Sequence, residues 1–194
     1  LVSGPLYVSR AGSHTAPYAS WLTAATNPCD AARLANDGAV IFVTNGAYHL
    51  TEPVTLNKGI TLQSVNGAWA TTLNGRGLNR CLELNHPNAR VAQLSVSNGA
   101  AAYGGGVLIH AAGGRMTECR VVNNTSSQSG GGVYMDGAGA LERCAIEANT
   151  AANQGGGGYL NGGGTLEGCL LARNQAVGSG GGVYCYDGGS LLSC

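Results

Sequence analysis

The sequence predicts an all-β fold, a parallel β-helix with about 25 residues in each coil. Equivalent residues recur at a fixed interval of 25 positions through the second half of the chain, which is typical of a repeat architecture. Within one repeat, Cys144 and Ile146 share one face of an alternating pattern, as in a strand. Glycine triplets recur in each repeat and would interrupt a helix, so helical-hairpin repeats are excluded.

Stacked coils place neighbouring strands about 4.8 Å apart, so equivalent side chains form columns along the stack, here called ladders. The predicted core ladder, which points inward, is Leu94, Cys119, Cys144, Cys169 and Cys194. The predicted asparagine ladder, at an outward or corner position where amides bond along the stack, is Asn124, Asn149 and Asn174. The tyrosine ladder at the same interval is Tyr134, Tyr159 and Tyr184.

The chain is predicted to divide at residue 38 into an N-terminal segment, 1–38, and a β-helix, 39–194, whose repeats become regular from about residue 94. The N-terminal segment contains an expected first strand at 6–9, a polar loop and a short helix. Asn27 suits the N-cap of this helix, Pro28 its first position, and Gly38 can close its far end. Because the end of a solenoid exposes its core, we expect the helix to cap the first of about six coils.

Composition excludes several function classes. The formal net charge is zero and only 10% of the residues are charged, which argues against a nucleic-acid-binding surface. No apolar run reaches the length of a membrane span. The start at Leu1 suggests a removed leader or an excerpted chain. The last repeat stops in mid-coil at Cys194, so we expect either a continuation or another molecule over that end. Copies stacked head to tail would build a filament.

Each regular repeat pairs two short motifs. A Gly-Gly-aliphatic or Gly-Gly-Gly motif occurs at 131–133, 156–158 and 181–183, and an aliphatic-x-x-Asn motif at 121–124, 146–149 and 171–174. These motifs resemble the repeats of polymorphic outer-membrane proteins and bacterial autotransporter passengers, with an aliphatic residue where an aromatic is usual and Gly or Val in place of alanine. The chain also resembles the pectate-lyase-like superfamily of right-handed parallel β-helices. The resemblance implies a right-handed helix and a secreted or surface-exposed protein.

Many members of that superfamily cleave acidic polysaccharides with calcium held by acidic residues. The acidic residues of this chain do not stack into such a group. Glu142 and Glu167 are expected in adjacent coils beside Arg143, and a glycosidase needs two carboxylates about 5–10 Å apart. We favour a solvated outer face with a compensating arginine. The paired-Asp and Gly-His-Gly motifs of pectin hydrolases are absent from the sequence, so no catalytic residue is assigned.

Metal and cofactor sites are not expected. The four histidines, His14, His49, His86 and His110, lack the spacing of metal ligands. The glycine triplets do not follow the strand, turn and helix pattern of nucleotide-binding loops.

The chain has seven cysteines. We expect the ladder thiols to be buried and free rather than disulfide-bonded, because parallel Cβ vectors make the disulfide torsion awkward. Cys185 stands outside the ladder, where the equivalent residues are Met135 and Leu160.

Two functional hypotheses follow. The first is a non-catalytic structural or adhesive element outside the cell, self-associating end to end. The second is a carbohydrate-binding or polysaccharide-cleaving domain, in which one tyrosine per coil, from Tyr134 to Tyr184, forms an aromatic strip for sugar rings. Tyrosine also packs half-buried along sheets, which remains the alternative for these rings. The irregular loops at 69–80 also favour the second hypothesis.

Overall fold

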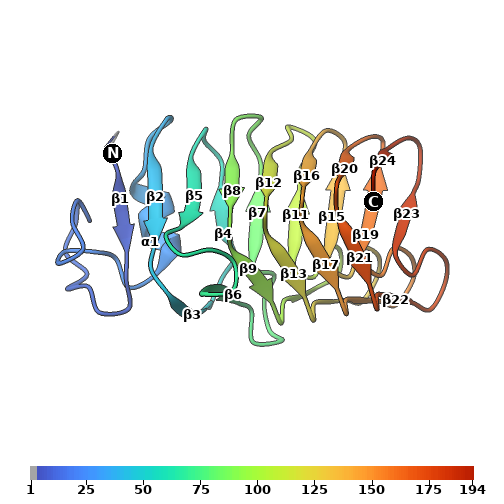
Figure 1. Cartoon of the computed structure of the whole chain (residues 1–194), viewed down its shortest axis with the longest axis horizontal. Coiled ribbons are helices and arrows are strands. Elements are labelled where there is room, and N and C mark those ends of the chain that lie inside the picture. The colour runs from blue at the N-terminus through green and yellow to red at the C-terminus, as the bar shows by residue number, and fades with distance from the viewer. Residues whose placement is uncertain (1–3) are drawn as a thin grey trace.

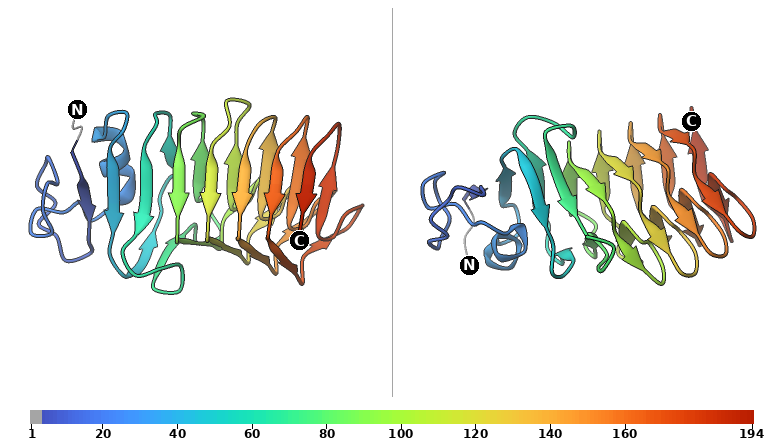
Figure 2. Two further views of the ribbon diagram at one scale, coloured as in Figure 1. Left: turned by 45° about the horizontal axis from the view of Figure 1, so that its top comes forward. Right: turned by 90° about the horizontal axis from the view of Figure 1, so that it is seen from below.

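The computed structural model describes residues 4–194 and confirms an all-β, right-handed parallel β-helix of about six coils. Figure 1 shows the coils stacked in chain order between the two termini, and Figure 2 shows them from two further sides. The strands form four parallel sheets, numbered here in the order in which the chain passes through them. A regular coil contributes one strand to each sheet.

Sheets 1 and 2 are joined by a short corner. Sheet 1 contains β1 (Leu6–Val8), β2 (Val40–Val43), β5 (Thr61–Ser64), β8 (Arg90–Ala92), β12 (Arg115–Thr117), β16 (Ala140–Glu142), β20 (Thr165–Glu167) and β24 (Ser190–Leu192). Sheet 2 contains β3 (Gly46–His49), β6 (Thr71–Asn74), β9 (Ser95–Ser97), β13 (Arg120–Val122), β17 (Ala145–Glu147) and β21 (Leu170–Ala172).

Sheets 3 and 4 complete the coil. Sheet 3 contains β10 (Ala100–Ala101), β14 (Thr125–Ser126), β18 (Thr150–Ala151) and β22 (Gln175–Ala176). Sheet 4 contains β4 (Val54–Leu56), β7 (Leu82–Leu84), β11 (Val107–Ile109), β15 (Val133–Asp136), β19 (Gly158–Asn161) and β23 (Val183–Cys185).

The corner between sheets 1 and 2 is made by one residue in the left-handed region. In successive coils this residue is Gln93, Glu118, Arg143 and Gly168, with φ between 50° and 59°. One such residue shifts the in-and-out alternation by one position, so Leu141 and Cys144 both point inward. Cys144 therefore lies at the corner, between β16, which ends at Glu142, and β17, which begins at Ala145.

The number of residues per coil becomes constant after two early coils of different length. The register pairs Val40 with Thr61 and Thr61 with Arg90, which are 21 and 29 positions apart. From Arg90 to Arg115 and onward, sheet 1 keeps 25 positions. Sheet 4 has one extra residue between β11 and β15, where Val107 pairs with Val133. The longer second coil contains the loop that carries Trp69.

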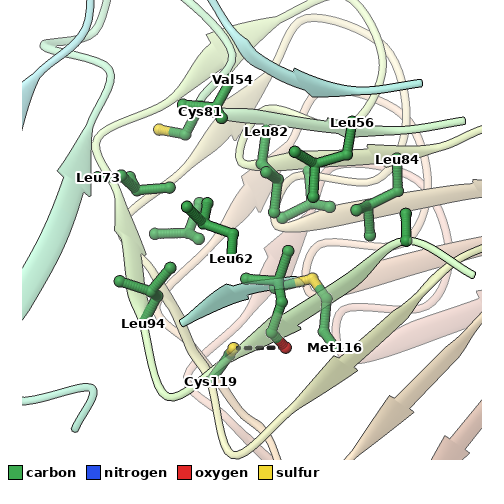
Figure 3. Close-up of a cluster of buried hydrophobic side chains, with 14 of the residues drawn as sticks. Val54, Leu56, Leu62, Leu73, Cys81, Leu82, Leu84, Leu94, Met116 and Cys119 are labelled. Atoms are coloured by element: carbon green, nitrogen blue, oxygen red, sulfur yellow. Dashed lines mark hydrogen bonds between the residues drawn. The ribbon is translucent and has the colours of Figure 1, made fainter. Parts of the chain in front are cut away.

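The inward side chains of successive coils form one apolar core that runs along the axis. Figure 3 shows Leu62, Leu82, Leu94 and Cys119, from three successive coils, gathered in this interior. Each of them has no more than 1% of its surface exposed. Because burial of a leucine-sized side chain contributes about 1.5–3 kcal/mol, this core is the main source of stability.

Helix α1 (Pro28–Leu34) packs beside the first coil (Figures 1 and 2). Asn27 is its N-cap, since its Oδ1 accepts a hydrogen bond from the backbone N–H of Cys29 at 2.8 Å. The prediction that Gly38 closes the helix is wrong. The helix ends at Leu34 because Ala35 is already extended, and the N–H of Gly38 bonds Gly59 instead.

The N-terminal edge of the β-helix is covered. Helix α1 contacts β4, the first strand of sheet 4, as well as β1 and β2. The outer edge of β1 pairs with the segment between β1 and α1, residues 9–27. The Tyr7 N–H donates to the carbonyl of Tyr18, and the Tyr7 carbonyl accepts from the N–H of Ala25, both at 2.9 Å. In the part of the chain that the structure describes, no helix is long and apolar enough to cross a membrane.

Candidate functional site

A groove of about 550 Å³ lies on the outer face of sheet 2 and is here called the sheet 2 groove. Strands β13, β17 and β21 and the corner before them form its floor, and the loop between β5 and β6 carries Trp69 at its side. Its polar and charged side chains are Gln93, Glu118, Arg120, Arg143, Glu147 and Arg173.

The loop that carries Trp69 is tied at its base. The hydroxyls of Ser64 and Thr71 lie 2.8 Å apart across its two ends, and Ser64 Oγ also donates to the carbonyl of Gly67 at 3.1 Å. Gly67 has φ of 87°, a conformation that glycine adopts without strain, and its carbonyl accepts from Ala70. The short, closed turn therefore presents Trp69 outward from the sheet.

Trp69 is held on one face and open on the other. The guanidinium carbon of Arg120 lies 3.6 Å from the centre of the Trp69 ring, a cation–π contact. Arg120 is itself paired with Glu147, with 3.7 Å between Nη2 and Oε2. The tryptophan nevertheless keeps 83% of its surface exposed. Its free ring face is therefore available to a ligand.

The charged side chains of the groove are paired from coil to coil. Arg143 donates to Glu118 at 3.3 Å, and Gln93 donates to the other oxygen of Glu118 at 2.9 Å. These bonds, that of Gln93 first, lower the pKa of the Glu118 carboxyl. Arg173 donates to Glu147 at 3.1 Å. Each arginine thus has a carboxylate partner, and the groove offers planar polar groups.

The tyrosine ladder lies on the outer face of sheet 4. The rings of Tyr134 and Tyr159 stack with centroids 5.1 Å apart and planes 2° apart, and Tyr159 stacks on Tyr184 at 5.4 Å. Tyr103 meets Tyr134 edge to face at 5.2 Å. Neighbouring rings therefore cover the faces on which a sugar would stack, and the edges and hydroxyls remain open. Sugar contact at these tyrosines stays a prediction.

The asparagine ladder lies inside the corner between sheets 2 and 3, and Asn124 and Asn149 are fully buried. Asn149 Oδ1 accepts from the backbone N–H and the Nδ2 of Asn124, both at 3.0 Å. Asn149 Nδ2 donates to the carbonyl of Val121 at 2.9 Å and to Oδ1 of Asn174 at 3.0 Å. The amides thus bond along the stack at a buried corner, which leaves them no role in ligand contact.

The core ladder is buried except at its last member. Leu94, Cys119, Cys144 and Cys169 have no more than 3% exposed surface, and Cys194 is exposed in the last coil. All seven thiols are free. The hydrogen bond with Cys119, together with burial, raises the pKa of Cys144. Free thiols buried in this way pack as small apolar groups.

The carboxylates considered for catalysis are not arranged around Arg143. Glu142 and Glu167 are register partners on sheet 1, as expected of adjacent coils. Glu142, however, forms an ion pair with Arg115, and Arg143 turns to Glu118 across the corner. Over residues 4–194, no group of three or more His, Cys, Asp or Glu side chains is placed to hold a metal ion.

No protein-family model, curated protein or solved structure matches the chain. The family resemblance therefore rests on the repeat motifs and the fold alone. Sequence reasoning noted the loop of Trp69 but missed its contact with Arg120. The two residues are 51 positions apart, and the loop lies outside the regular repeat, so no interval links them. The signal that the sequence offered was a tryptophan within an irregular loop.

Proposed function

We propose that this chain is a non-catalytic structural and adhesive element of a secreted or surface-exposed protein, related to the pectate-lyase-like and autotransporter β-helices. The observation that carries the proposal is the continuous stack of register-matched coils, with an amide ladder bonded through the interior. Such a stack is stiff and presents regular faces at fixed spacing. These are the properties that a stalk or an adhesin requires.

A second candidate function is carbohydrate binding, and the observation that favours it is Trp69 above the sheet 2 groove. An exposed aromatic face beside paired polar groups suits the apolar and hydroxylated sides of a sugar ring. Polysaccharide cleavage has less support, because Glu142 is engaged by Arg115 rather than poised opposite a second acid.

Self-association is also part of the proposal. End-to-end contact between copies of this chain, through unpaired backbone groups at an end of the stack, would build fibres where the contacts do not close. Light scattering over a range of protein concentrations tests this, since a mass that rises with concentration is expected and a strictly constant monomer mass would contradict it.

Electrophoresis through gels that contain polysaccharides distinguishes an adhesive function from a catalytic one. Retardation of the intact protein with no loss of polymer supports adhesion. Clearing of the polymer around the band, tested with polygalacturonate and neutral glucans, would contradict a non-catalytic role. Unhindered migration in every gel would remove the carbohydrate-binding candidate and leave the structural one.

A further inference from the structure

We propose that the sheet 2 groove binds a neutral, hydroxyl-rich oligosaccharide laid along the axis of the β-helix, with one sugar ring on the open face of Trp69. This inference rests on the second candidate function and names its site and its ligand class. Three features of the groove carry it.

The first feature is the fixed indole. Arg120 occupies one face of the Trp69 ring at 3.6 Å, and the side chain of Arg120 is only 20% exposed. The loop is closed by the Ser64–Thr71 hydrogen bond at 2.8 Å. Trp69 therefore loses little freedom when a ligand stacks on it, which lowers the entropic cost of binding.

The second feature is the repeat of the floor. The corner residues Gln93, Glu118 and Arg143 belong to three successive coils, joined by side-chain bonds of 2.9 and 3.3 Å. Coils follow one another at about 4.8 Å, which is close to the length of one pyranose unit in an extended chain. A polymer of sugars therefore meets one polar side chain from each of these three coils, an amide, a carboxylate and a guanidinium in turn.

The third feature is the pairing of the charged groups. The groove contains three arginines and two carboxylates, in which Glu118 pairs with Arg143 and Glu147 pairs with both Arg120 and Arg173. An anionic ligand would have to compete with these carboxylates. Hydroxyl groups, in contrast, donate to the carboxylates and accept from the guanidinium groups without breaking an ion pair. The geometry therefore suits a neutral glycan.

The tyrosine ladder and a second groove fit this ligand less well. The faces of Tyr134, Tyr159 and Tyr184 are stacked on one another. The groove beside Arg76, Asn98 and Asn123 has polar groups but no aromatic ring among its lining residues.

Fluorescence of Trp69 provides the test. The chain has two tryptophans, so Trp21→Phe leaves Trp69 as the sole tryptophan reporter. We would titrate this variant with cellohexaose, xylohexaose, mannohexaose, laminarihexaose and, as the acidic comparison, hexagalacturonate. A saturable change with at least one neutral hexasaccharide at up to about 10 mM is expected. No change with any neutral sugar, or a response to hexagalacturonate alone, would overturn the proposal.

Calorimetry on two further variants distinguishes the site from the function. Trp69→Ala is expected to weaken binding of the responsive sugar about tenfold or more, whereas the matched control Trp21→Ala is expected to bind like wild type. Equal affinity of wild type and Trp69→Ala would overturn the groove assignment while carbohydrate binding itself stands. Trp69 is 83% exposed, so its removal is not expected to disturb folding, which circular dichroism checks.

Discussion

Replacing Asn149 by alanine measures how much stability the buried amide ladder contributes. The Asn149 side chain is fully buried and takes part in four hydrogen bonds. Two join it to the backbone N–H and side-chain amide of Asn124. The other two join it to the carbonyl of Val121 and to Oδ1 of Asn174. Alanine removes all four and adds none.

The loss of stability comes mainly from the buried polar groups that lose their hydrogen-bond partner. The backbone N–H of Asn124 loses its partner, and the carbonyl of Val121 loses a donor, both in a region closed to water. A buried polar group without its partner costs about 1–3 kcal/mol, so two such groups predict a loss of about 4 kcal/mol in the free energy of unfolding. Asn149→Asp should cost more, because its second oxygen would face the Val121 carbonyl and the charge would be buried.

Urea unfolding followed by circular dichroism gives the free energy of unfolding of each variant. The matched control is Asn153→Ala, in the same coil, because Asn153 is exposed and its side chain makes one bond to Gln128 at 2.7 Å. We expect the control to change stability by no more than about 0.5 kcal/mol. A loss below about 1 kcal/mol for Asn149→Ala would refute the reasoning, since it would mean that the ladder bonds contribute nothing net.

Three further predictions concern the thiols and the glycines. A thiol-specific dye should label two thiols, the exposed Cys185 and Cys194, in the native protein and all seven after unfolding; labelling of more than two without unfolding would contradict the burial of the ladder. Gly157→Ala should lower the free energy of unfolding by about 2 kcal/mol or more, because the new Cβ would lie 2.6 Å from the carbonyl oxygen of Gly182 in the next coil. The control Gly182→Ala should be nearly neutral, because its Cβ would meet no atom within 4 Å. Equal unfolding midpoints of the two variants would contradict this. Burial raises the pKa of Cys81 from 9.0 to about 12, so the stability that the protonated thiol contributes is complete below pH 9 and is lost as the pH rises toward 12. In that pH window, this thiol alone should lower the free energy of unfolding by about 1.4 kcal/mol per pH unit. Cys81→Ala should remove this contribution from the pH dependence of stability, and the same pH dependence in wild type and variant would contradict the prediction.

The repeat made the interior of the fold predictable. A constant interval of 25 positions fixes the register, so the side chains that stack as ladders follow directly from the sequence. The corners were harder to predict from the sequence, because Gln93, Glu118 and Arg143 adopt positive φ although none of them is glycine. Their conformation is imposed by the coils above and below rather than by local preference.

The candidate site was predictable only in part. The loop that carries Trp69 was recognised as irregular, but its direction depends on the bond between Ser64 and Thr71 and on the turn at Gly67. The end of α1 shows the same limit, since the chain leaves the helix at Ala35 and not at Gly38. In both places tertiary contacts decide between several local conformations that the sequence permits.

The most direct test of sugar binding is a crystal structure of the protein soaked with the neutral hexasaccharide that changes Trp69 fluorescence. We expect sugar density along the sheet 2 groove, with one ring parallel to the indole of Trp69 on the face opposite Arg120. Sugar bound on the tyrosine ladder of sheet 4, with the sheet 2 groove empty, would contradict it.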